Sequence, residues 1–207
     1  MSQRTIQSKR LRYMCLIAFF IAIELIMKFT GLGNLPINPV LNVTLMNIPV
    51  AIGAILLGPF AGLILGIVFG ITSFFQPMSP LVADLFTMDQ FNTIVLCVVT
   101  RALMGVCCGW IARGLKRIDK TKTVSYFVSA FFAAFLNTLF FMGYLILVFY
   151  HTDPIQQRVA AKGAVNWFNF VILFVGINGI LELIATTIIG GGVAKGVDYA
   201  LSKRAKN

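Results

Sequence analysis

Arg101 lies in the middle of the apolar run "FNTIVLCVVTRALMGVCCGW" (residues 91–110), which is long enough to cross a bilayer. A charge at the centre of a membrane helix costs at least about 2.5–3.5 kcal/mol, so it normally faces a bundle interior or a hydrated cavity. Arg101 could form an ion pair with Glu182 that locks two helices together, or its guanidinium could bind the carboxylate of a ligand. A third reading is snorkelling toward the headgroups. The residues themselves leave all three open.

Other polar side chains are expected at the same depth. Counted from the predicted outer helix ends, Arg101 is about ten residues deep and Asn137 and Asn178 about twelve, so all three lie about 15–18 Å down at about 1.5 Å per residue. Glu182 follows Asn178 by four positions and shares its helix face, one turn deeper. We therefore predict these four as substrate-binding residues. Glu24 and Lys28 are the remaining charges that stand out inside an apolar segment.

Three residues nearer the helix ends complete the candidate site. Asn47 and Asn92 stand at the tops of two segments, where they could bind substrate or simply cap a helix and form turns. Trp167 begins the last segment, where it could form a pocket wall or anchor the helix at headgroup level.

The composition indicates that these residues belong to a membrane protein. Hydrophobic residues make up 58% of the 207-residue chain and charged residues only 12%, with a mean hydropathy of +0.89, whereas soluble domains carry about 25% charged residues. We predict an integral membrane protein with a single domain over residues 1–207. The net charge of +10 comes from clusters at both ends and in one central loop, which suggests cytoplasmic flanks and no nucleic-acid partner.

Six apolar segments are expected as helices, at about 12–30, 43–57, 60–76, 91–112, 124–149 and 166–194. The second is short, so it could be tilted, broken or re-entrant. Gly58 and Pro59 predict a tight turn and a two-helix hairpin. The predicted fold class is all-α, a bundle of six transmembrane helices.

The basic clusters predict the topology. With six crossings they all fall on one face, so both termini are expected in the cytoplasm. Residues 31–42, 77–90 and 150–165 then form outer loops that could close over a pocket. The basic residues are Arg4, Lys9, Arg10 and Arg12; Arg113, Lys116, Arg117, Lys120 and Lys122; and Lys203, Arg204 and Lys206.

Small residues at steps of four predict close helix packing. Gly62, Gly66 and Gly70 form a ridge that could pack inside the bundle or against a partner protein. Ala18 and Ala22 form a similar pair on the first helix, where a docking role is one possibility.

Catalytic and cofactor chemistry has little support. His151 is the only histidine, and no cluster has metal-ligand spacing, so we expect no metal, no cofactor and no enzyme activity. "IIGGGVAKG" lacks the Ser or Thr of a phosphate-binding loop, so the chain is not expected to hydrolyse ATP.

The order of several motifs resembles the substrate-binding S components of energy-coupling factor (ECF) vitamin transporters. The resemblance covers nearly the whole chain and is carried by Ala18 and Ala22, by "TLMNIPVAIGAILLGPFAGLILGIVFGITSFFQ", and by "RALMGVCCGWIARGL" followed by a basic loop. "LMNIPVAIGAILLGP", "RALMG" and "AAFLNTLFFMG" look most like the pantothenate-binding branch.

The resemblance implies a vitamin-binding subunit of a multi-pass membrane transporter, expected in a bacterial plasma membrane. Its partners would be a membrane scaffold subunit, docked on Ala18 and Ala22, and two ATPases. From their depth and chemistry, Arg101, Asn137 and Asn178 could bind the pantothenate anion. S components for riboflavin, folate, cobalamin or pyridoxine remain alternatives. A stand-alone ion-coupled carrier using Glu182 or Glu24 is a further one.

Overall fold

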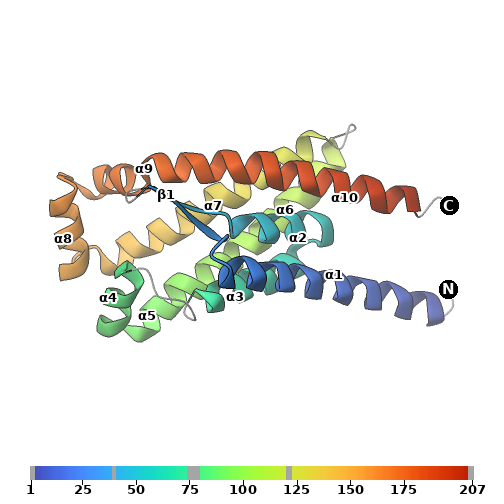
Figure 1. The fold of residues 1–207 in the computed structure, drawn as a ribbon, viewed down its shortest axis with the longest axis horizontal. Coiled ribbons are helices and arrows are strands. Elements are labelled where there is room, and N and C mark those ends of the chain that lie inside the picture. Colours follow the sequence, from blue (N-terminus) through green and yellow to red (C-terminus); the bar gives the residue numbers. More distant parts are fainter. Residues whose placement is uncertain (1–2, 39–40, 74–79, 120–122, 205–207) are drawn as a thin grey trace.

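The computed structural model describes residues 3–38, 41–73, 80–119 and 123–204, which fold mainly into helices along the long axis of the molecule (Figure 1). The prediction of a helical protein is confirmed. The long segments are α1 (Gln3–Phe29), α2 (Asn47–Leu57), α3 (Pro59–Thr72), α5 (Gln90–Ile94) continued by η1 (Val95–Val99) and α6 (Thr100–Ile118), α7 (Val124–Phe149), and α9 (Trp167–Ala185) continued by η2 (Thr186–Gly190) and α10 (Gly191–Arg204). The elements η1 and η2 are π-helical turns within longer helices.

Three helices in the described part of the chain are long and apolar enough to cross a membrane. They span Gln90–Ile118, Val124–Phe149 and Trp167–Lys203, and Asn47–Leu57 and Pro59–Thr72 are shorter apolar helices. The protein is therefore embedded in a membrane.

The predicted outer loops contain secondary structure that the sequence analysis did not predict. A hairpin of β1 (Asn34–Asn38) and β2 (Leu41–Thr44) pairs Asn34 with Thr44, with an irregularity between Pro36 and Asn38. The other two loops hold the short helices α4 (Pro80–Met88) and α8 (Asp153–Ala161), joined by an ion pair between Arg158 and Asp84 (2.7 Å). Residues 39–40 and 77–79 of the predicted loops lie outside the described residues.

Two apolar clusters fill the bundle. One lies between α1, α2, α3, α6, α7 and α10 and includes Phe20, Val50, Leu65, Met104 and Tyr126. The other lies toward the α8 end and joins α4, η1, α7, α8 and α9 through Leu85, Leu96, Leu145, Ile155 and Phe170. Both chain ends lie at the opposite end of the molecule (Figure 1).

The glycine ridge of α3 packs directly on the backbone of α6. A methyl group on Gly62 would overlap the carbonyl of Gly105, one on Gly66 would overlap the carbonyl of Arg101, and one on Gly70 would lie 2.6 Å from Cα of Val98. Two membrane helices approach this closely only when no side chain stands between them. The ridge thus packs inside the bundle and fixes the position of the Arg101 backbone.

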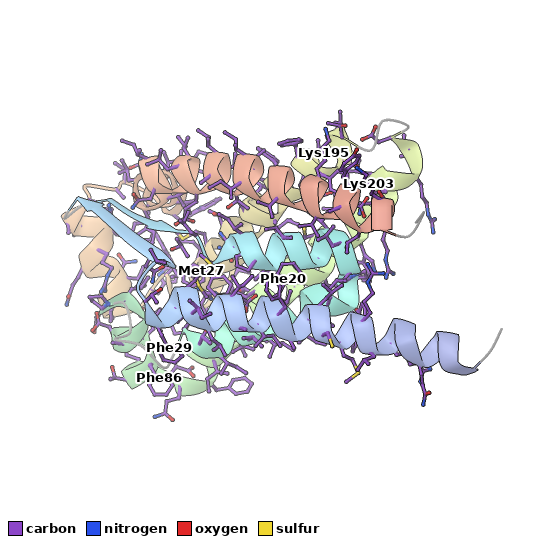
Figure 2. All side chains as sticks on the ribbon, turned by 45° about the vertical axis from the view of Figure 1, so that its right-hand side comes forward. Phe20, Met27, Phe29, Phe86, Lys195 and Lys203 are labelled. Carbon is purple, nitrogen blue, oxygen red and sulfur yellow. The ribbon has the colours of Figure 1, made fainter. Side chains whose placement is uncertain are left out.

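A polar network ties four helices together near the chain ends. Lys116 Nζ donates to the carbonyl of Ile55 (2.8 Å) and lies 4.7 Å from the centre of the Tyr126 ring, whose hydroxyl donates to Asp198 (2.7 Å). Lys195 and Lys203 lie on α10 at the same end of the molecule (Figure 2). Basic residues are thus concentrated at the end that carries both termini.

Candidate functional site

The Arg101 guanidinium lies between two phenyl rings inside the bundle. Its carbon Cζ is 4.7 Å from the centre of the Phe69 ring on α3 and 5.2 Å from that of Phe141 on α7. Nη1 donates to the carbonyl of Cys97 (2.9 Å), whereas Nε is buried without a hydrogen-bond partner. Aromatic faces favour a cation there, but they do not satisfy its remaining N–H donors, so the group can still bind an anion.

Glu182 does not form the ion pair with Arg101 that was one of the alternatives for this arginine. Glu182 Oε1 instead accepts a hydrogen bond from the backbone N–H of Thr44 (2.7 Å), which ties α9 to strand β2. Arg101 nevertheless interacts electrostatically with both Glu182 and Lys28. Charged groups from α1, α6 and α9 therefore share one region of the bundle.

Several buried amide and hydroxyl groups lack hydrogen-bond partners. Asn47 is completely buried and neither of its side-chain polar atoms has a partner; the same holds for the amide oxygens of Asn137 and Asn178 and the hydroxyl of Thr186. The large majority of buried side-chain polar atoms in proteins are hydrogen-bonded. These buried groups are therefore available to bind a ligand or water.

Asn47 and Thr186 belong to the same level of the bundle. A methyl group on Gly190 would lie 3.9 Å from Cβ of Ala51 and 3.5 Å from Cβ of Ala130, so η2 packs between α2 and α7. Thr186 lies about one turn before Gly190, and Asn47 lies about one turn before Ala51, in both cases toward the α8 end. The two side chains are thus expected to face each other across this interface.

Two predicted site residues have other surroundings. Asn92 lies in the first turn of α5 and is held by the N-cap residue Asp89: its backbone N–H and Nδ2 both donate to the Asp89 carboxylate (2.9 and 2.7 Å), and its Oδ1 accepts from the Tyr144 hydroxyl (2.7 Å). These hydrogen bonds lower the pKa of Asp89. Trp167 is 54% exposed and lines an apolar groove of about 1020 Å³ between α7 and α9.

The structure adds residues that the sequence analysis did not place in the site. Phe69 and Phe141 flank the guanidinium, and Thr186 contributes a buried hydroxyl. Glu24 is completely buried on α1 with both carboxyl oxygens unpartnered. A charge in an apolar segment pointed to Glu24, but the aromatic residues could not be distinguished from ordinary core residues. The described residues include no group of three His, Cys, Asp or Glu side chains suited to a metal.

Helix α9 is broken just above Asn178. Gly176 has φ +46° and ψ −144°, a conformation that side-chain-bearing residues rarely adopt. Next to the break, Lys162 Nζ donates to the carbonyl of Leu173 (3.2 Å), as a capping group does at a helix end. Broken helices at membrane depth normally line a cavity or binding site.

We expect Gly176→Ala to lower the free energy of unfolding by about 1–3 kcal/mol, because alanine would have to adopt a backbone conformation that is strained for any residue with a side chain. No atom lies within 4 Å of the added methyl group, so no clash contributes. Gly143→Ala is the matched control, since Gly143 lies within α7 with equally open surroundings. Thermal unfolding of both variants in detergent makes the comparison. Equal stability would mean that α9 can straighten at no cost.

A family model described as the ECF transporter, substrate-specific component, matches residues 12–190. A search of curated proteins finds no match.

Proposed function

The chain belongs to the substrate-specific components of ECF transporters, and we propose that its ligand is pantothenate. A substrate-specific component is the vitamin-binding subunit of a transporter and not an enzyme, and it works with a scaffold subunit and ATPases. The family leaves the identity of the vitamin open, so that choice depends on the chemistry of the site.

The observation that carries the proposal is the Arg101 guanidinium, whose Nε is buried without a hydrogen-bond partner. Its bidentate donors suit a carboxylate, and a buried charge-assisted hydrogen bond is about twice as strong as a neutral one. Pantothenate has one carboxylate, one amide, two hydroxyls and a dimethyl carbon. Asn137 and Asn178 offer buried amide oxygens to its N–H or O–H groups, and Phe69 and Phe141 offer apolar surface to its methyl groups.

Calorimetric titration of the purified protein in detergent tests the ligand. The panel contains pantothenate, riboflavin, folate, cobalamin and pyridoxine, together with panthenol, which has an alcohol in place of the carboxylate. We expect pantothenate to bind and panthenol to bind about 10–100-fold more weakly, which corresponds to one charge-assisted hydrogen-bonded contact of about 1.5–3 kcal/mol. Equal affinity for both, or binding of a different vitamin, would contradict the proposal.

We also propose six crossings with both termini in the cytoplasm of a bacterial cell. Support comes from the position of the two chain ends at one end of the molecule (Figure 1), where Lys195 and Lys203 also lie (Figure 2). The ligand would then enter from the opposite end, past α4, α8 and the β-hairpin.

Docking on the scaffold is assigned to Ala18 and Ala22, both of which are exposed on α1. We expect Ala18→Trp and Ala22→Trp to preserve vitamin binding, because a large side chain there enters no core, and to abolish copurification with the scaffold and ATPases. Leu147→Trp, at an 85% exposed position on α7, is the control and should assemble normally. If the alanine variants lose binding and assembly together, the two alanines serve folding instead.

A further inference from the structure

Glu24 is the most deeply buried acid that the mechanism above does not use. Its side chain has no exposed surface, and neither carboxyl oxygen has a hydrogen-bond partner. Phe20 and Lys28, four residues before and after it, are 5% and 9% exposed, so all three share the inward face of α1. An unpartnered acid in this position costs stability.

Contacts on both sides fix what Glu24 faces. One turn before Glu24, Phe20 packs against α2: a methyl group on Gly53 of α2 would lie 3.7 Å from its ring. About one turn after Glu24, Met27 lies near Met46: a methyl group on Gly33 would lie 3.1 Å from the carbonyl of Met27 and 2.9 Å from Cγ of Met46. Figure 2 shows Phe20 and Met27 on the side of α1 that faces α2. Glu24 lies between these two contacts. It therefore faces the part of α2 between Met46 and Gly53, where Asn47 begins the helix.

Asn47 and Glu24 are thus neighbouring side chains whose hydrogen-bonding atoms have no partner. Neither is exposed, and all four of their polar side-chain atoms lack partners. Apolar side chains of the same size would pack at these positions without that cost. Phe69, which flanks the Arg101 guanidinium, belongs to the same apolar cluster as Phe20 and Met46, so this pair lies in the same part of the bundle as the guanidinium.

We propose that Glu24, supported by Asn47, is the specificity-determining residue of the vitamin site and accepts hydrogen bonds from hydroxyl groups of the ligand. Arg101 holds the carboxylate, so the two residues bind opposite functional groups of one hydroxylated carboxylic acid. This assignment rests on the proposed function. It predicts that the site discriminates against acids of the same shape that lack hydroxyl groups.

The test compares two ligands on three proteins by calorimetry. The ligands are pantothenate and N-(3,3-dimethylbutanoyl)-β-alanine, which has the same skeleton without the two hydroxyls. The wild-type protein should prefer pantothenate by at least about tenfold. Glu24→Met should remove most of this preference by weakening pantothenate binding about 10–100-fold while changing the other affinity little. Arg101→Gln should weaken both ligands equally. Equal effects of Glu24→Met on both ligands would overturn the assignment.

A second measurement separates failure of this inference from failure of the pantothenate proposal. Glu24→Met should raise the melting temperature of the ligand-free protein, because it removes an unpartnered buried acid at nearly constant volume. If pantothenate does not bind but the melting temperature rises, pantothenate is not the ligand, but the inference that Glu24 is buried for ligand binding is kept. A lower melting temperature would overturn the inference in either case, since Glu24 would then have a structural role.

Ser129→Ala is the matched control for both measurements. Ser129 is completely buried on α7, but its hydroxyl is satisfied by the carbonyl of Ser125 (2.6 Å). Its replacement should leave both ligand affinities unchanged and should not raise the melting temperature.

Discussion

Arg101→Gln should weaken pantothenate binding by about 10–100-fold and leave panthenol binding nearly unchanged. The reason is that glutamine keeps a hydrogen-bonding side chain but loses the charge that the ligand carboxylate needs, a difference of about 1.5–3 kcal/mol. Panthenol lacks that carboxylate, so the loss of the Arg101 charge should change its affinity little. Titrating both ligands into both proteins gives a double-mutant cycle between one side chain and one functional group of the ligand.

The control for this cycle is Arg158→Gln on α8. Arg158 pairs with Asp84 (2.7 Å) in a partly exposed position, so its loss should affect neither affinity and cost little stability. The cycle also decides between the two roles that the sequence left open for Arg101. If Arg101→Gln lowered both affinities equally and also the melting temperature, the guanidinium would hold the helices together instead of binding the anion.

Gly66→Ala should strongly lower the stability of the bundle. The new carbon would overlap the carbonyl oxygen of Arg101, a backbone atom that cannot move by changing a rotamer. The two helices would have to separate along their whole contact, which costs at least about 1–3 kcal/mol for an overpacked core. Thermal unfolding in detergent should show a clearly lower melting temperature and, with it, reduced yield.

Gly114→Ala on α6 shows whether this loss depends on position. No atom lies within 4 Å of a methyl group there, and alanine favours a helix over glycine by about 1 kcal/mol, so the variant should be as stable as the parent or more so. Equal melting temperatures for Gly66→Ala and Gly114→Ala would mean that α3 and α6 are not in backbone contact.

Long-range periodicity predicted most of the helices but little of the outer region. Runs of apolar residues and the Gly58–Pro59 turn located the membrane segments, and Gly58 indeed has a φ of +96° between α2 and α3. The β-hairpin, α4 and α8 are short, and each is stabilised by contacts with distant residues, such as Thr44 with Glu182 and Asp84 with Arg158. Such contacts leave no periodic signal in the sequence. The break at Gly176 also could not be predicted, because an isolated glycine is common in membrane helices.

Depth along a helix predicted the site less completely, because depth does not give direction. Arg101, Asn137, Asn178 and Glu182 were predicted from depth, and each is at least partly buried in the bundle. Asn92 has the same chemistry as Asn47, yet it donates to the neighbouring N-cap residue Asp89, whereas the Asn47 side chain has no partner. Whether a polar side chain is free for a ligand depends on such neighbours, most of which come from other helices.

The glycine contact between α3 and α6 also bears on how a ligand is recognised. Gly66 lies against the backbone of Arg101, in the part of the bundle with the least room for movement. The elements α4 and α8 at the outer end are short, and α9 is interrupted at Gly176. An acid entering from that end would meet adaptable walls first and an immobile charge at the inner end of its path. Chemical variation among transportable acids should therefore be tolerated far from the carboxylate and rejected next to it.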